Sequence, residues 1–214
     1  LEFIMADARN KHADVNVTGA GIQSNWCAQT IAAATVTGMK TVLVPSGPID
    51  GFKPEEYGGN TLLHYILGAE VRTPVKTWDE IPEALDKVAS ELKRNGHNPY
   101  IAEFAGSTPI GIMGYVNALL ELLCQARDRG IKIDYIVVPS GSGGTQAGLI
   151  LGNMGLNANI KVLGISVSYD KDKLTRIVAK LVNSGAQLLN VDVHVDPKDI
   201  GHIRIGEGAI HCLV

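Results

Sequence analysis

A glycine-rich segment near the middle of the chain has the residue types of a phosphate-binding loop. It follows the β-branched and aromatic run 133–138 and precedes a helical pattern that begins at Gln146. Glycines let the backbone approach a ligand closely, and the free N–H groups at a helix start attract negative charge. The three glycines and two hydroxyl residues of this segment are Gly141, Ser142, Gly143, Gly144 and Thr145. The pattern predicts a phosphate site, and a structural turn that binds nothing is the alternative.

The order of these residues differs from the two common nucleotide motifs. No lysine follows the loop, as a nucleotide P-loop requires, and the glycines are not spaced as G-x-G-x-x-G. The spacing therefore argues against ATP and NAD. A second motif is needed to identify the phosphate compound.

A second turn of small and polar residues lies earlier in the chain. It follows a short strand predicted at 15–17 and contains Gln23, Ser24 and Asn25. An alanine-rich helix is predicted after it, over 26–38. Taken alone, Ser24 is typical of a helix N-cap.

Strand and helix patterns alternate along the whole chain. Helices are expected between the strands, including one over 171–189. The expected strands are 15–17, 41–44, 70–73, 99–102, 133–138, 160–165 and 191–195. Such alternation favours an α/β fold with parallel sheets covered by helices on both faces, in three αβα layers, and with ligands at the carboxyl ends of the strands.

The composition excludes several classes of partner. The chain has 214 residues, a formal net charge of −3 and no basic cluster, which argues against nucleic acid and against an anionic membrane surface. Neither a signal peptide nor a membrane-spanning segment is apparent. Cys27, Cys124 and Cys212 are widely spaced and form no C-x-x-C motif, which indicates a reducing, cytoplasmic compartment. The six histidines show no ligand spacing, so we expect no metal site.

Together, the two turns resemble the D-cysteine desulfhydrase and 1-aminocyclopropane-1-carboxylate deaminase family of pyridoxal phosphate enzymes. The first turn reads Gly21-Ile22-Gln23-Ser24-Asn25, with Gln29-Thr30 following, and the second covers 141–148. Further landmarks stand in family order and at close to family spacing at 1–3, 59–60, 67–71 and 111–116. The resemblance covers most of the chain.

The resemblance implies a fold type II enzyme whose cofactor is pyridoxal 5′-phosphate. It implies that the loop from Gly141, and residues 142–145 in particular, hold the phosphate. Asn25 would hydrogen-bond the phenolic oxygen of the cofactor ring. Ser24 would be the catalytic residue that faces the substrate, with Gln23 beside it. In the deaminases this serine attacks the cyclopropane ring or transfers a proton, and in the desulfhydrases it binds the substrate carboxylate or helps to move a proton.

The implied activity is elimination and deamination of a small amino acid. Conversion of D-cysteine to pyruvate, sulfide and ammonia is the first choice, and ring opening of 1-aminocyclopropane-1-carboxylate is the alternative. A non-catalytic, truncated remnant of the fold is a rival from a different class. We expect a homodimer for the full-length protein. We also expect a smaller domain, 11–106, and a larger cofactor-binding domain that contains 1–10 and 107–214.

The sequence also departs from the family pattern. The family's Schiff-base lysine would come just before Leu1, and neither Lys11 nor Lys40 replaces it by motif. Trp26 stands where other members have His or Gln, and Ala28 where many have Arg. Because the lysine and the family's C-terminal portion are absent, we expect the chain to be a fragment.

Four other residues lie near the two motifs. We expect Cys27 to be a small packed residue and not a reactive thiol. Ser107, Thr108 and Tyr115 either approach the cofactor or serve the helix start beside them, Ser107 and Thr108 as capping hydroxyls.

Overall fold

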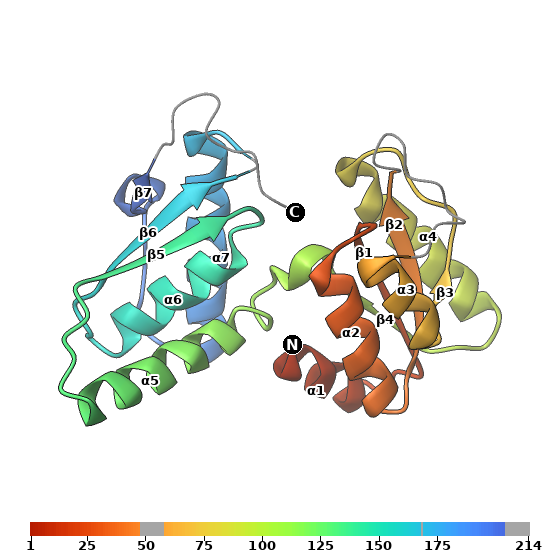
Figure 1. The fold of residues 1–214 in the computed structure, drawn as a ribbon, viewed down its shortest axis with the longest axis horizontal. Coiled ribbons are helices and arrows are strands. Elements are labelled where there is room, and N and C mark those ends of the chain that lie inside the picture. The colour runs from red at the N-terminus through yellow and green to blue at the C-terminus, as the bar shows by residue number, and fades with distance from the viewer. Residues whose placement is uncertain (48–57, 168, 204–214) are drawn as a thin grey trace. The chain divides into compact units, whose positions relative to one another are not determined.

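The computed structural model describes residues 1–47, 58–167 and 169–203. The chain forms two compact units, Leu1–Gly106 and Ser107–Val214 (Figure 1). Each unit contains a parallel sheet and helices that pack on it. The expected α/β fold with parallel sheets is confirmed.

The first unit is built on four parallel strands in the order β3-β2-β1-β4. The strands are β1 (Val15–Gly21), β2 (Lys40–Ser46), β3 (Glu70–Val71) and β4 (Pro99–Ala102). In the register of the two middle strands, Val15 lies opposite Lys40 and Gly21 lies opposite Ser46. The turn after β1 therefore lies at the carboxyl edge of the sheet, where the fold class places ligands.

Helices cover both faces of this sheet because successive side chains of a strand point to opposite sides. Val17 and Val44 face α4 (Ile81–Arg94), where they form a buried cluster with Leu85. Leu43 faces α2 (Asn25–Val36) and packs with the buried Ile31. The remaining elements of the unit are α1 (Glu2–Asn10), α3 (Gly59–Ile66), η1 (Trp78–Glu80) and η2 (Phe104–Gly106).

Helix α1 packs within the first unit. It contacts α2, and its Asp7 accepts a hydrogen bond of 2.8 Å from the Tyr100 hydroxyl of β4. The sequence-based division joins residues 1–10 to 107–214 instead. That division stays a prediction.

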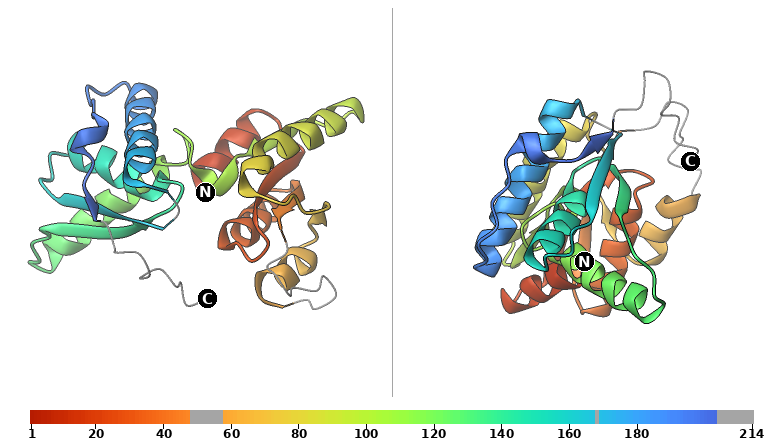
Figure 2. Two further views of the ribbon diagram at one scale, coloured as in Figure 1. Left: turned by 90° about the horizontal axis from the view of Figure 1, so that it is seen from above. Right: turned by 90° about the vertical axis from the view of Figure 1, so that its left-hand side faces the viewer.

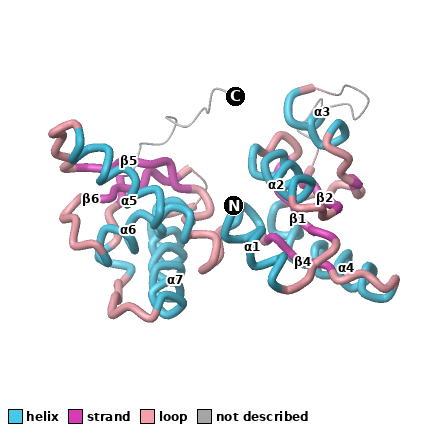
Figure 3. Tube along the Cα trace, turned by 90° about the horizontal axis from the view of Figure 1, so that it is seen from below, coloured by secondary structure: helices cyan, strands magenta, loops and turns pink. Residues whose placement is uncertain are grey.

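The second unit has three parallel strands in the order β5-β6-β7 and occupies the green-to-blue part of Figure 2. The strands are β5 (Tyr135–Ser140), β6 (Lys161–Ser166) and β7 (His202–Ile203). The helices are α5 (Met113–Asp128), α6 (Gly144–Gly155), α7 (Lys171–Leu189) and the short η3 (Pro197–Asp199). Helix α6 contacts β5 and β6 and packs against both α5 and α7 (Figure 3).

The strand expected at 191–195 is wrong, whereas the helix expected just before it is confirmed as α7. The Asn183 side chain of α7 accepts from the Val195 N–H at 2.9 Å and donates to the Val195 C=O at 3.0 Å. These are the backbone groups that a sheet ladder would use. The place beside β6 belongs to β7, where His202 pairs with Gly164.

Candidate functional site

The predicted phosphate loop joins β5 to α6 in the second unit. Gly143 is the N-cap residue of α6 and has a φ of 84°, a left-handed conformation that residues with a Cβ rarely adopt. A Cβ at this position would lie 3.1 Å from Val178 Cγ2 and 3.2 Å from Ile177 Cγ2, both on α7. Conformation and packing therefore both call for glycine here.

Ser107 brings a further hydroxyl to this loop. Its Oγ donates to Ser142 Oγ at 2.7 Å, and a Cβ on Gly144 would lie 2.6 Å from the same Ser107 oxygen. Thr108 has a different role, because its Oγ1 accepts from the Gly111 N–H at 3.1 Å. The Ser107 side chain thus contacts the loop, and Thr108 stabilises the turn that leads to α5.

The start of α6 supplies N–H groups for an anion. The hydrogen bond from the Ala147 N–H to the Gly143 C=O, at 2.9 Å, is the first of the helix. The N–H groups of 144–146 therefore have no acceptor one turn back. Together with the half-buried hydroxyl residues Ser142 and Thr145, they fit the phosphate group of pyridoxal phosphate.

Two buried polar atoms adjoin the loop without a hydrogen-bond partner among the described residues. They are Ser140 Oγ, at the end of β5, and Gln146 Oε1, in the first turn of α6. Gln146 is held by its other amide atom, because Nε2 donates to the Gly201 C=O at 2.7 Å. Buried polar groups of this kind are usually completed by water or a ligand.

The second predicted site lies in the turn between β1 and α2. The Ser24 N–H donates to the Gly21 C=O at 2.9 Å, and the Ser24 C=O accepts from Ala28 at 3.3 Å. Ser24 is the N-cap residue of α2, yet its side chain makes no capping hydrogen bond. The half-buried hydroxyl therefore does not cap the helix in the usual way, and its contact with the substrate stays a prediction.

The Gln23 side chain joins this turn to the start of α3. Its Oε1 accepts from the Asn60 N–H at 2.9 Å, and its Nε2 donates to Thr61 Oγ1 at 2.9 Å and to the Gly58 C=O at 3.1 Å. Both ends of the amide are therefore engaged within the protein. Its predicted contact with the substrate stays a prediction.

Asn60 is the residue at this turn whose role the sequence analysis missed. Its Nδ2 donates to the Gln23 C=O at 2.8 Å and to Asn25 Oδ1 at 2.7 Å. The sequence contained one signal, because Gly59-Asn60 stood out as a landmark of the resemblance. Nothing in the spacing tied this pair to the turn.

Two neighbours of Ser24 on α2 face the protein interior. Cys27 is fully buried in a cluster with Ile31, which confirms that it is a packed residue. Burial raises the pKa of the Cys27 thiol to about 12, and a hydrogen bond with Ser24 opposes this shift in part. The Trp26 Nε1–H donates to Thr18 Oγ1 at 3.0 Å, so the indole is tied to β1.

Tyr115 lies on α5 beside α6. A Cβ on Gly148 would lie 2.6 Å from Tyr115 Cβ, and the tyrosine side chain is partly exposed. The close approach of the two helices explains why Gly148 is small. Contact between Tyr115 and a cofactor stays a prediction.

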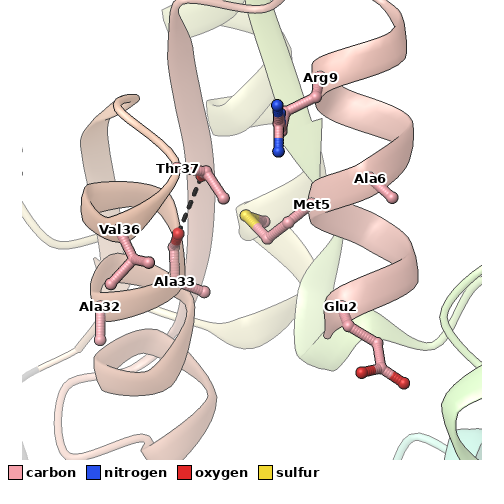
Figure 4. Close-up of a pocket in the computed structure, with 8 residues that line it drawn as sticks. All are labelled: Glu2, Met5, Ala6, Arg9, Ala32, Ala33, Val36 and Thr37. Carbon is pink, nitrogen blue, oxygen red and sulfur yellow. Dashed lines mark hydrogen bonds between the residues drawn. The ribbon is translucent and has the colours of Figure 1, made fainter.

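A separate groove lies between α1 and α2 (Figure 4). It has a volume of about 420 Å³ and is lined by Glu2, Met5, Ala6, Arg9, Ala32, Ala33, Val36 and Thr37. None of the predicted site residues lies in it. Across the described ranges, no group of three or more His, Cys, Asp and Glu side chains is placed to hold a metal ion. None of the helices in those ranges has the length and hydropathy that crossing a bilayer requires.

Curated relatives are similar to this chain over most of its length. A "Putative 1-aminocyclopropane-1-carboxylate deaminase" of Pyrococcus horikoshii is 39% identical over 199 residues, which is 92% of this chain and 58% of the relative. A "D-cysteine desulfhydrase" of Klebsiella pneumoniae is 36% identical over 182 residues, which is 84% of this chain and 55% of the relative. The chain thus spans less than two thirds of the length of these relatives.

The fold is similar to solved structures of the same kind. The crystal structure of an "ACC deaminase homologue" superposes with a TM-score of 0.85 at 38% identity, and the match covers 95% of this chain and 59% of that one. The family model described as "Pyridoxal-phosphate dependent enzyme" matches residues 1–209. Two strand-to-helix turns of the expected build, together with this match, show that the chain belongs to the pyridoxal-phosphate dependent enzyme family.

Proposed function

We propose that this chain forms the cofactor-binding part of an enzyme that eliminates or deaminates a small amino acid with pyridoxal 5′-phosphate. The glycine loop at the start of α6 carries the proposal, because it offers free N–H groups and hydroxyls to a phosphate. When bound, the cofactor supplies an electron sink for the amino-acid carbon, and the protein supplies orientation and proton transfer.

The proposed cofactor contacts follow the resemblance, residue by residue. Ser142, Thr145 and the N–H groups of 144–146 bind the phosphate, and Gly141 and Gly143 let the backbone form the loop without side chains. Asn25 donates a hydrogen bond from its side-chain amide to the phenolic oxygen of the ring. Its exposure and the absence of a partner for Nδ2 among the described residues support this role.

Ser24 is the proposed catalytic residue. Its hydroxyl does not cap α2 and has the Cys27 thiol as its hydrogen-bond neighbour, and its proposed role is to hold or move a proton at the substrate. The N–H groups at the start of α2 attract the substrate carboxylate. Gln23, beside it, is proposed to contact the substrate, and its hydrogen bonds to the α3 start hold the turn in place.

We propose that the lysine joined to the cofactor in this family is neither Lys11 nor Lys40. Lys11 pairs with Asp7 at 2.7 Å on α1. Lys40 begins β2 opposite Val15, at the amino edge of the sheet. The seven residues of β1 separate that edge from Ser24 by about 20 Å.

D-Cysteine is the proposed substrate, with water converted together with it to pyruvate, hydrogen sulfide and ammonia. The alternative is 1-aminocyclopropane-1-carboxylate, which the name of the relative at 39% identity favours. A homodimer and a cytoplasmic location are part of the same proposal. The free thiols of Cys27 and Cys124 support a reducing compartment.

Steady-state assays with both compounds test the function. We expect sulfide and pyruvate from D-cysteine with a kcat/KM at least 10-fold above that for release of 2-oxobutanoate from 1-aminocyclopropane-1-carboxylate, because a single misplaced group at the reacting centre costs about that much. A higher value for the cyclopropane compound would select the alternative. Absence of both products from the cofactor-loaded protein would favour the non-catalytic remnant.

A further inference from the structure

We propose that Asn60 is a positioning residue that fixes the orientation of the Asn25 side-chain amide for the cofactor. The proposal rests on the proposed contact between Asn25 and the phenolic oxygen. Asn60 Nδ2 lies 2.7 Å from Asn25 Oδ1 and 2.8 Å from the main-chain oxygen of Gln23. One amide group therefore bridges the backbone of the turn and the side chain that meets the cofactor.

The direction of these hydrogen bonds follows from a backbone group. The Gln23 carbonyl can only accept, so the Asn60 amide must turn its NH₂ group toward it. The same NH₂ group faces Asn25, which must then present its oxygen. The Asn25 Nδ2 is thereby turned outward as a donor. The opposite orientation of Asn25 would place two NH₂ groups against each other.

A second backbone group holds Asn60 itself. The Asn60 N–H donates to Gln23 Oε1 at 2.9 Å, which leaves Gln23 Nε2 to donate to Thr61 and Gly58. Gly59 has a φ of 54°, and a Cβ there would lie 2.7 Å from Gln23 Oε1. Glycine at position 59 thus allows the close approach that places Asn60.

This orientation has a chemical consequence for the bound cofactor. A donor at the phenolic oxygen favours its deprotonated, negatively charged form, whereas the carbonyl oxygen of a reversed Asn25 would repel it. The start of α3 therefore acts on the cofactor through Asn25, without touching it.

A double-mutant cycle tests this arrangement through cofactor affinity and absorbance. We expect Asn25→Ala and Asn60→Ala each to raise the Kd for pyridoxal 5′-phosphate about 5-fold, the size of one hydrogen bond. Both variants should also shift the pH profile of cofactor absorbance to higher pH. The double variant should bind no more weakly than Asn25→Ala alone, because Asn60 acts only through Asn25.

Two further variants separate orientation from folding. Asn60→Asp offers acceptors in place of donors and reverses Asn25, so we expect it to raise the Kd about 10-fold, more than Asn60→Ala does. It also carries the test if Asn60→Ala fails to fold. The control is Thr61→Val, which removes the hydrogen bond between Thr61 and Gln23. The hydrogen bond between Asn60 and Asn25 is kept. It should lower the Tm and leave the Kd within about 2-fold.

The outcomes distinguish the two levels of the proposal. If Asn25→Ala leaves the Kd and the absorbance profile unchanged, the proposed cofactor contact of Asn25 is wrong, and the role of Asn60 falls with it. If Asn25→Ala weakens binding but Asn60→Ala does not, the contact stands and the positioning role is overturned. A double variant that is about 5-fold weaker than Asn25→Ala also overturns it, because Asn60 then acts independently of Asn25.

Discussion

The turn between β1 and α2 and the loop between β5 and α6 each end a parallel strand and start a helix, but different interactions hold them in shape. In the first, side-chain amides of Gln23 and Asn60 form hydrogen bonds with backbone groups of the turn and of α3. In the second, a Cβ would lie 3.1 Å from Val178 Cγ2 at Gly143 and 2.6 Å from Ser107 Oγ at Gly144, so neighbouring atoms would have to shift.

The difference shows two ways to prepare a helix start for a ligand. A side-chain network fixes the direction of a donor such as Asn25, which suits a single directed hydrogen bond. A glycine loop presents several N–H groups at once, which suits a phosphate with three oxygens. We therefore expect the first turn to be sensitive to loss of polar atoms and the second to added atoms.

The largest effect is expected from Gly143→Asp in the glycine loop. The new side chain would meet the left-handed backbone, the close contacts with α7 and the phosphate charge together. We expect pyridoxal phosphate affinity to fall about 1,000-fold, which corresponds to roughly 4 kcal/mol. Absorbance titration gives the affinity, and far-UV circular dichroism should show that the helices remain.

The matched control is Gly155→Ala at the other end of α6. A Cβ there meets no atom within 4 Å, so affinity should stay within about 2-fold of the original protein. Retained affinity in Gly143→Asp would show that this loop does not bind the phosphate. The contrast between the two turns as ligand sites would then be wrong.

The next effect is expected from Ser24→Ala in the first turn. Because the hydroxyl makes no capping hydrogen bond, we expect the free energy of unfolding to fall by less than about 0.5 kcal/mol. Loss of proton transfer or substrate binding should lower kcat/KM roughly 100-fold. Ser90→Ala, on the exposed face of α4, is the control for both measurements. A lowered Tm with near-normal kcat/KM would make Ser24 an ordinary N-cap.

The smallest effect is expected from Gln23→Ala, which removes the link between the turn and α3. The lost hydrogen bonds should lower the free energy of unfolding of the first unit by about 2 kcal/mol. Both tryptophans, Trp26 and Trp78, belong to this unit, so their fluorescence in urea reports its unfolding. Ser90→Ala, on the exposed face of α4 in the same unit, should change stability by less than about 0.5 kcal/mol. Equal stability of the two variants would show that side chains do not hold the first turn.

Most of the fold could be predicted because apolar periodicity decides it. The stripe of α7 was visible in the sequence, and its observed bounds, Lys171–Leu189, agree with it. Residues 191–195 alternate in the same way as a strand, but the Asn183 side chain occupies the backbone groups of Val195. The hydrogen-bond partner that prevents the strand is 12 positions away, and local periodicity carries no information about it.

The candidate site shows the same limit. The glycines of the second turn could be recognised because glycine at a position indicates the backbone conformation that is needed at that same position. The role of Asn60 could not, because its partner Gln23 is 37 positions away and polar residues at a helix start have many uses. The resemblance marked Asn60 as a landmark, and only the hydrogen bonds give it a physical role.

The fixed direction of the hydrogen bonds around Gln23 and Asn60 restricts how this part of the sequence can drift. Because backbone groups set the direction, a single exchange that turns a donor into an acceptor puts like atoms face to face. A compensating exchange at the partner position restores the match. We therefore expect accepted substitutions at positions 23, 25 and 60 to be correlated among descendants of this sequence, although each position alone resembles an ordinary polar residue.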